Sequence, residues 1–401
     1  MEGIRCSFLV LLTLALAASF SPTANAHTIF TTLFINDVSQ GDGTCVRMNT
    51  DPEHCTSPVP SVTSDDMACG INGEQPVAFT CPAPVGAKLT FQWRLWADAE
   101  QPGVIDISHK GPCAVYAKQM TNMSAEDAAA GPGWIKLWAE GYDAGAGKWC
   151  TEKLIDSGGL LSVAVPASLP PGSSWLFRPE LLALHNAAAG DPQFYVGCAQ
   201  VYIAGPPSSS SSSSDDDAPA TAVPDDPGVL ALPAGKSVSI PGYLRASDPG
   251  LTFDIYAPSF PYPIPGPEVY IPSSSSFSSS SSSSSPLPPS PPPPLVPPSS
   301  SYLIKNANWV GRELDAYATE EGCWAASEAC WSRAGACYGA APPTGSAGCR
   351  AWEARCDEVQ DACAAGDFRG PPGAGRKLAS QEPAPPAPED IPPAVNAAAA
   401  G

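Results

Sequence analysis

Histidine is the side chain that binds transition metals most readily, and this chain has only four, at positions 27, 54, 109 and 185. The first follows Ala24-Asn25-Ala26, which has the A-x-A form of a signal-peptidase cleavage site. Cleavage there would make His27 the first residue of the mature protein, with its α-amine and its ring Nδ1 both free to bind one metal ion. A second imidazole would complete a T-shaped set of three nitrogens, a geometry that favours copper over zinc.

The other histidines stand in different surroundings. His109 lies in Ser108-His109-Lys110-Gly111-Pro112, a Gly-Pro loop that can hold a ring rigidly, although a loop histidine is more often simply solvated. Gln193 and Tyr195 are two residues apart in a predicted strand and therefore share one face, where His185 can join them in a polar cluster. The alternative is an ordinary buried hydrogen-bond network. His54 is expected to cap or decorate a loop.

The elements that position these residues are predicted to be strands. Residues 27–205 alternate short runs rich in Thr, Val, Phe, Trp and Ile with Gly, Pro and Asp turns, and they show little helical period. This pattern predicts a mainly β fold, an immunoglobulin/fibronectin-like antiparallel β-sandwich with long loops. The predicted strands include Thr28–Ile35, Lys88–Trp96, Ser162–Val165, Trp175–His185 and Gln193–Ile203.

Apolar structure continues beyond a first serine tract, so the sandwich domain is predicted to span residues 27–272. Residues 206–227 are then a Ser-rich insertion in a surface loop, which costs little conformational entropy. Ser273–Ser301 is almost wholly Ser and Pro and is predicted to be an extended linker. The Pro/Ala-rich tail at 369–401 is expected to be disordered.

The charge of the chain excludes two classes of partner. Its 401 residues carry 20 Lys+Arg against 40 Asp+Glu, a formal net charge of −20, which excludes a nucleic-acid binder and a polybasic membrane-surface protein. Residues 1–26 have the short apolar run of a signal peptide, and no later stretch is long enough for a membrane anchor. Export to the extracellular medium also suits the 14 cysteines. The sequon at Asn122 is consistent with export and predicts a glycan there.

Six cysteines near the C-terminus recur every seven residues, at 323, 330 and 337 and again at 349, 356 and 363. Seven residues are two helical turns, so each triplet lies along one stripe of a helix. The turn sequence Gly339–Gly348 separates the triplets. Of the fifteen pairings that six cysteines allow, an antiparallel helical hairpin selects one, and the alternative is an unrelated framework with chance spacing. The predicted disulfides are Cys323–Cys363, Cys330–Cys356 and Cys337–Cys349.

This predicted Cys-rich helical hairpin module spans residues 302–368 and has no function that its sequence reveals. Trp324, Trp331 and Trp352 are available to anchor it to a cell wall or to the substrate. The competing interpretation, slightly favoured, is that these rings form the core of a very small domain, since such domains bury the aromatic residues they have.

Taken together, the histidines and their neighbours resemble a known family. His27, the loop His109-Lys110-Gly111-Pro112, and His185 followed by Gln193-Phe194-Tyr195-x-x-Cys198 resemble the lytic polysaccharide monooxygenases of auxiliary-activity family 9, the fungal cellulose-active group. The resemblance covers about residues 27–272, interrupted by the Ser-rich insertion. Further stretches that agree are His27–Phe34, Gly133–Ile155, Ser237–Tyr256 and Tyr262–Pro267.

The resemblance implies a copper site. His27, through its amine and Nδ1, and His109, through Nε2, would form a "histidine brace" around one copper ion, with Tyr195 at the axial position. His185 and Gln193 would lie outside the ligands and orient bound oxygen species. Whether the ring of His27 carries a methyl group is not visible in the sequence.

The resemblance also implies a substrate contact and a disulfide. Tyr262 matches a surface aromatic that stacks on a glucan chain, and Cys69 and Cys198 match a disulfide of the family. The five other cysteines of the domain are odd in number and leave at least one free thiol or an intermolecular bond; they are at positions 45, 55, 81, 113 and 150. The Ser-rich insertion and the Cys-rich C-terminal extension depart from the common pattern of the family.

The implied reaction is copper-dependent oxidative cleavage of cellulose or related β-1,4-glucans, by hydroxylation at carbon 1 and/or carbon 4. Its co-substrate would be dioxygen or hydrogen peroxide, with an external electron donor, and its substrate an insoluble polysaccharide such as cellulose or hemicellulose. The protein is expected to be a monomer. Two alternatives are a non-catalytic copper- or carbohydrate-binding protein on the same fold, and a glycoside hydrolase, which is disfavoured because no paired-carboxylate motif stands out.

Overall fold

The computed structural model describes residues 27–125, 128–205, 229–278, 293–379, 388 and 390–395. The predicted signal peptide (1–26) and the Ser-rich insertion (206–227) lie outside these ranges. Within them, no helix is long and apolar enough to cross a lipid bilayer.

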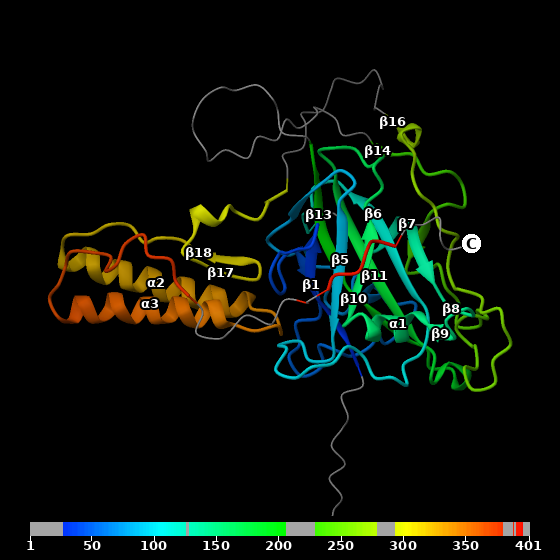
Figure 1. Ribbon diagram of the computed structural model, residues 1–401. Helices are drawn as coiled ribbons and strands as arrows, with labels where there is room; N and C mark the ends of the chain where they lie inside the picture. Colours follow the sequence, from blue (N-terminus) through cyan, green and yellow to red (C-terminus); the bar gives the residue numbers. More distant parts are fainter. Residues whose placement is uncertain are drawn as a thin grey trace, which may run out of the picture.

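Two β-sheets form the body of the molecule (Figure 1). The smaller sheet is antiparallel, with strand order β10-β5-β1-β2. Its strands are β1 (Ile29–Ile35), β2 (Val38–Ser39), β5 (Lys88–Arg94) and β10 (Leu160–Ala164).

The larger sheet has the order β15-β7-β6-β11-β13-β3, with β12 paired to β11 and β4 paired to β13. The β4–β13 pair is parallel and the others are antiparallel. The observed fold is therefore the mainly β, antiparallel sandwich that the sequence predicted. The strands of this sheet are β3 (Val46–Arg47), β4 (Cys81–Pro84), β6 (Cys113–Met120), β7 (Gly131–Glu140), β11 (Ser174–Ala183), β12 (Gln193–Val196), β13 (Cys198–Ala204) and β15 (Val238–Ile240).

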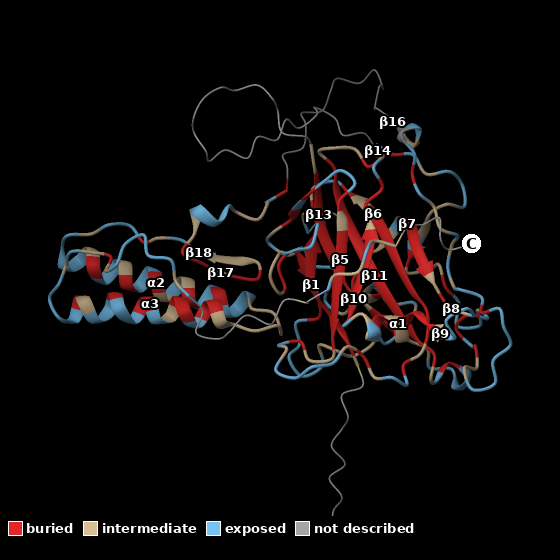
Figure 2. Ribbon diagram, viewed as in Figure 1, coloured by how far each residue is buried: buried red, intermediate tan, exposed pale blue. Residues whose placement is uncertain are grey.

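The larger sheet is covered on both faces, and β11 shows why. All ten of its residues are buried, and successive side chains of a strand point to opposite faces. Trp175 and Phe177 belong to the core between the two sheets, whereas Leu176 and Leu182 belong to a second apolar cluster on the other face. Figure 2 shows this burial along the central strands. Long loops, rather than a third sheet, cover the outer face.

A buried polar cluster lies in that second layer. Arg178 is fully buried, and its Nη1 donates to Glu180 Oε2 at 2.6 Å. The same carboxylate oxygen accepts from the Tyr243 hydroxyl at 2.8 Å. Lys136 donates to the carbonyl oxygen of Pro265 at 2.7 Å, and burial lowers its pKa to about 8. The outer layer thus holds more positive than negative groups.

Smaller elements lie in the connections. The first turn of α1 (Cys150–Asp156) is capped by Glu152, whose Oε2 accepts from the backbone N–H of Trp149 at 2.9 Å. The remaining short elements of the sandwich are β8 (Tyr142–Asp143), β9 (Lys148–Trp149), β14 (Val229–Leu230), β16 (Phe277–Ser278), and the 3₁₀ turns Asp65–Met67, Ala187–Ala189 and Ser274–Ser276.

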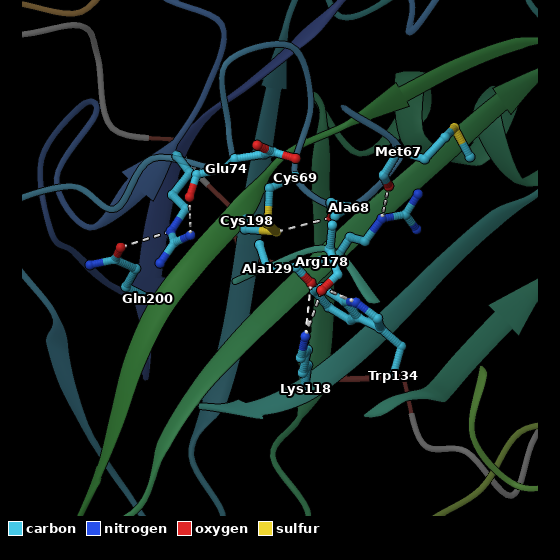
Figure 3. The surroundings of a disulfide bond; sticks show 12 residues. Met67, Ala68, Cys69, Glu74, Lys118, Ala129, Trp134, Arg178, Cys198 and Gln200 are labelled. Carbon is cyan, nitrogen blue, oxygen red and sulfur yellow. Dashed lines mark hydrogen bonds between the residues drawn. A yellow bond between two sulfur atoms is a disulfide. The ribbon is translucent and has the colours of Figure 1, made fainter. Parts of the chain in front are cut away.

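The sandwich domain has three disulfides among its described residues, each with one cysteine on a strand of the larger sheet: Cys45–Cys81, Cys69–Cys198 and Cys113–Cys150. The second is the pair that the family resemblance implied. Figure 3 shows its surroundings, where Arg178 donates from Nε to the carbonyl oxygen of Met67 and so ties the loop before Cys69 to β11. Cys55 is the free cysteine of the described residues, in agreement with the odd count, and burial raises the pKa of its thiol.

The C-terminal module is the predicted helical hairpin. Its helices are α2 (Glu320–Ala340) and α3 (Ala347–Ala364), and all three predicted disulfides join them. Thr319 caps α2 by accepting a hydrogen bond from the N–H of Gly322 at 3.1 Å. The sequence did not predict the β-hairpin in front of the helices, β17 (Ile304–Asn306) and β18 (Trp309–Gly311), or the 3₁₀ turn Ser299–Ser301.

The β17–β18 hairpin covers one side of the helix pair and completes the core of the module. Trp352 is fully buried there, with its ring 5.7 Å from that of Trp309, and its Nε1 donates to the carbonyl oxygen of Cys330. Trp352 is therefore a core residue and no surface anchor. Trp324 is exposed, and Trp331 is half-buried.

The described parts of the predicted linker and tail make defined contacts. Thr80 donates its N–H to Pro294 and accepts from Val296, which places residues 294–296 against the start of β4. The N–H of Leu378 donates to Leu303, and that of Val395 to Ser162. The prediction of disorder from 369 onward is wrong for Leu378 and Val395, because their apolar side chains pack against existing cores and their backbone finds partners.

Candidate metal centre

Three rings from distant parts of the chain meet at one end of the sandwich. The ring centroids of His27 and His109 are 6.2 Å apart, those of His27 and Tyr195 6.0 Å, and those of His109 and Tyr195 6.1 Å. His27 lies just before β1, His109 in the loop before β6, and Tyr195 on β12. The fold therefore brings together the three residues for which the sequence predicted a metal site.

His27 is positioned by its neighbour. Thr28 is buried, and its Oγ1 lies 2.6 Å from the carbonyl oxygen of Val104 and 3.2 Å from that of Arg94. These contacts fix the backbone directly after His27 against the end of β5. The ring of His27 is half-buried, and burial together with the nearby His185 lowers its pKa.

The loop that carries His109 is held on two sides. The N–H of Gly111 donates to Thr151 Oγ1 at 3.0 Å, which fastens the loop to α1. On the other side it lies against β11, where a Cβ at position 111 would stand 1.8 Å from the carbonyl oxygen of Leu182. Only glycine fits this close approach. The rigid support that the Gly-Pro sequence suggested thus has a physical cause.

The two ring nitrogens of His109 have different surroundings. Its Nδ1 lies 3.1 Å from Ser108 Oγ, whereas its Nε2 is buried and makes no hydrogen bond of normal geometry in the described structure, although the Gln193 side chain lies close enough to act on the ring. Burial, and secondly the nearby His185, lower its pKa to about 4, so the ring is neutral at ordinary pH. When Nδ1 carries the proton and donates to Ser108, Nε2 presents a free lone pair. A buried polar atom without a partner is costly, and a metal ion at Nε2 would remove that cost.

Tyr195 is nearly fully buried, and its hydroxyl donates to Gln193 Oε1 at 2.9 Å. Burial, and secondly the charge of Asp191, raise the pKa of this hydroxyl, so it keeps its proton. Gln193 in turn donates from Nε2 to Asp191 Oδ2 at 3.2 Å. The role of Asp191 was not predicted from the sequence, where its only signal is its place in the Gly190-Asp191-Pro192 turn two residues before Gln193.

His185 lies against His109, with ring centroids 4.1 Å apart and an interplanar angle of 32°. Burial lowers its pKa, and its Nδ1 has no partner among the residues that the structure describes. Of the predicted polar cluster, Tyr195 is thus one of the three rings, His185 packs against His109, and Gln193 is hydrogen-bonded to Tyr195. His54 does not belong to it: it is exposed and contacts Asp51 on its own loop, as expected.

Side chains alone do not complete a metal site here. No group of three or more His, Cys, Asp and Glu side chains able to hold a metal ion occurs in the described ranges. A three-nitrogen copper site therefore requires a donor besides the two imidazoles. The α-amine of His27, freed by signal cleavage, is the donor that the sequence suggested.

A sequence model of Auxiliary Activity family 9 (formerly GH61) matches residues 27–262. The chain belongs to auxiliary activity family 9. It is 46% identical over 372 residues to AA9 family lytic polysaccharide monooxygenase H of Botryotinia fuckeliana, covering 91% of this chain and 79% of that protein. It is 43% identical over 368 residues to AA9 family lytic polysaccharide monooxygenase C of Aspergillus tamarii, covering 91% and 92%.

Among solved structures, that of CvAA9A is 31% identical, with a TM-score of 0.48, and the match covers 61% of this chain and 98% of that one. The two sequence alignments are much longer than the stretch 27–262, so these relatives also share sequence with the C-terminal part of the chain. The protein is a lytic polysaccharide monooxygenase, an oxidoreductase of a copper-dependent family of secreted fungal enzymes that act on insoluble polysaccharides.

The structure corrects one residue that the family resemblance suggested. Tyr262 is buried, its hydroxyl donates to the carbonyl oxygen of Gly250 at 2.8 Å, and the edges of Trp149 and Phe253 enclose its ring. Its ring has no free face with which to stack on a sugar. In the same loop Tyr256 is 73% exposed.

Proposed function

We propose that the mature protein binds one copper ion through the α-amine and Nδ1 of His27 and Nε2 of His109, and cleaves cellulose or a related β-1,4-glucan by hydroxylation at carbon 1 and/or carbon 4. The observation that carries this proposal is the buried, partnerless Nε2 of His109 beside the rings of His27 and Tyr195. Bound copper would supply the redox chemistry with dioxygen or hydrogen peroxide and an external electron donor.

The protein's own residues prepare the site for that chemistry. His109 stays neutral because of its depressed pKa, so no proton competes for Nε2 above about pH 5. In the tautomer with the proton on Nδ1, Ser108 Oγ accepts from that nitrogen and Nε2 is left free for the metal. The ring of Tyr195 lies beside the two histidine rings. Burial raises the pKa of its hydroxyl, which therefore stays protonated.

Three further residues control protons and orientation. His185 packs on His109 and has a free Nδ1, so it can hold or deliver one proton at the edge of the site. Gln193 fixes the Tyr195 hydroxyl through Oε1, and Asp191 fixes the amide of Gln193 by accepting from Nε2. Because Asp191 determines which end of the amide faces Tyr195, it is a positioning residue.

We propose that Tyr256, and not Tyr262, is the aromatic residue that contacts the substrate. An exposed tyrosine face can stack on the apolar face of a pyranose ring, and Tyr256 offers one in the loop that was expected to do so. Ile107, two residues before His109, is 61% exposed and adds apolar surface in the same loop.

The test uses copper-loaded mature protein, a reductant and amorphous cellulose, followed by mass spectrometry of the soluble sugars. Aldonic acids indicate oxidation at carbon 1, and ketoaldoses indicate carbon 4. Mass spectrometry of the intact chain should also find His27 as the first residue, and electron paramagnetic resonance should give a type-2 copper signal. Copper binding without any oxidised sugar would contradict the proposal for cellulose and favour a binding role.

A further inference from the structure

Helix α2 of the C-terminal module carries three aromatic side chains at a spacing of seven residues. Trp324, Trp331 and Tyr338 each follow a cysteine that is bonded to α3. Trp324 is 43% exposed and Tyr338 40%, with Trp331 half-buried between them. Seven helical residues rise about 10.5 Å, so these three residues, here called the aromatic row, repeat at that interval.

Helix α3 orients two members of the row. The Nε1 of Trp331 donates to Gln360 Oε1 at 2.9 Å, and the hydroxyl of Tyr338 donates to Glu353 Oε2 at 2.6 Å. Gln360 and Glu353 are themselves seven residues apart, so a polar row runs alongside the aromatic one. Gly335, between Trp331 and Tyr338, adds no side chain, and a Cβ there would meet nothing within 4 Å.

Two members of the aromatic row, Trp324 and Tyr338, are not needed to close the core of the module, whereas Trp331 packs against that core with part of its ring. That core is completed by the β17–β18 hairpin, which covers the fully buried Trp352 with Trp309. Figure 2 shows exposed residues alternating with buried ones along α2, on the part of the molecule that projects from the sandwich. Exposed tryptophan and tyrosine on so small a module indicate a binding surface.

The module is also held in a fixed orientation. Asn308 donates from Nδ2 to the carbonyl oxygen of Gly43 at 2.7 Å and accepts from the N–H of Cys45 at 2.9 Å. Lys305 adds a hydrogen bond to the carbonyl oxygen of Gln40 at 2.6 Å. Tyr338, the end of the row nearest the sandwich, lines a junction cavity of about 430 Å³.

We propose that the aromatic row is a binding surface for one extended β-1,4-linked glucan chain. An interval of about 10.5 Å corresponds to two sugar units of such a chain, so successive aromatic rings meet equivalent sugar faces. Glu353 and Gln360 offer oxygen atoms to the sugar hydroxyls. The polymer is neutral, because the acidic side chains of Glu328 and Glu353 disfavour an anionic one. The choice of a glucan rests on the proposed function.

The test is a pull-down of the full mature protein on microcrystalline cellulose without reductant. The double variant Trp324→Ala/Tyr338→Ala should lower the partition constant about tenfold, equivalent to about 1.4 kcal/mol. The matched control Ser332→Ala, at an exposed position of the same helix, should bind as the parent does. The variant Trp324→Phe/Tyr338→Phe keeps aromatic faces and should retain binding. Thermal unfolding of all variants should be unchanged, because the altered side chains are exposed.

Unchanged cellulose binding of the double alanine variant would overturn the proposal. A second copy of the chain on this surface would overturn it too, and sedimentation would reveal it as a dimer of the parent that the variant fails to form. The assay works with copper-free protein, so it does not depend on catalysis. Absence of oxidised sugars would therefore refute the proposed function while leaving this inference standing. Unchanged binding by the variant would refute this inference while leaving the proposed function standing.

Discussion

The metal centre and the C-terminal hairpin leave different groups available to a ligand. At the metal centre, long-range strand pairing brings His27, His109 and Tyr195 together and buries a nitrogen that has no protein partner. In the hairpin, three local disulfides and the buried Trp352 form the interior, and the rings of Trp324 and Tyr338 remain exposed. The buried Nε2 of His109 beside two other rings is what a bound metal ion would complete. The exposed rings of Trp324 and Tyr338 are what a bound polymer would cover.

The largest expected effect concerns what holds the hairpin. Replacing Cys330 and Cys356 with alanine should cost about 3 kcal/mol, because the disulfide closes a loop within a module that has a small core. Differential scanning calorimetry should show the module unfolding before the sandwich. Replacing the free Cys55 with serine is the control and should leave both transitions in place. If the module of the double variant unfolded at the same temperature as in the parent, packing alone would hold the hairpin.

The second effect concerns what completes the metal centre. His109→Ala removes the partnerless Nε2 and should weaken copper binding by at least about 100-fold, beyond the effect of losing an outer hydrogen bond. Isothermal titration calorimetry of the mature chain measures it. His54→Ala, which removes an exposed histidine paired with Asp51, should leave the dissociation constant unchanged. Equal losses in both variants would contradict the assigned ligand.

Alanine substitution at two glycines tests how much space surrounds the backbone in each region. Gly111→Ala would place a Cβ against the Leu182 carbonyl and should destabilise the sandwich by about 1–3 kcal/mol. Gly335→Ala, in the interior of α2 with open space around it, should stabilise the hairpin by about 0.5–1 kcal/mol. Chemical denaturation followed by circular dichroism measures both. The comparison fails if the two substitutions act in the same direction.

The smallest effect is a pH dependence that belongs to the sandwich. The pKa of Lys136 is lowered to about 8 in the folded protein, so between about pH 8 and 10 the unfolded chain binds more protons than the folded one. Stability should therefore rise with pH in that window, by at most about 1.4 kcal/mol per pH unit. The difference in unfolding free energy between the parent and Lys136→Met isolates this contribution. A difference that stays constant from pH 8 to 10 would contradict the lowered pKa.

The sequence predicted best what depends on local geometry. The seven-residue cysteine spacing defined the hairpin and its three bonds, because helical periodicity places cysteines on one stripe without any knowledge of the rest of the fold. It did not predict Cys45–Cys81 or Cys113–Cys150. Those pairs depend on sheet order, including the parallel pairing of β4 with β13.

At the candidate site, strand alternation correctly placed Gln193 and Tyr195 on one face, and their hydrogen bond follows from it. Strand alternation could not predict which of the loop residues Tyr256 and Tyr262 is exposed. An irregular loop has no period that distinguishes the buried Tyr262 from the exposed Tyr256, so family pattern alone chose the wrong ring.

The Cys45–Cys81 disulfide joins two places where the C-terminal part of the chain touches the sandwich. Asn308 binds at Cys45, and residues 294–296 bind at Thr80, next to Cys81. Both ends of the connection to the hairpin are thus fastened around one covalent link. The enzyme should then rotate in solution as a single particle, with one tumbling time for backbone amides of the catalytic body and of the hairpin alike.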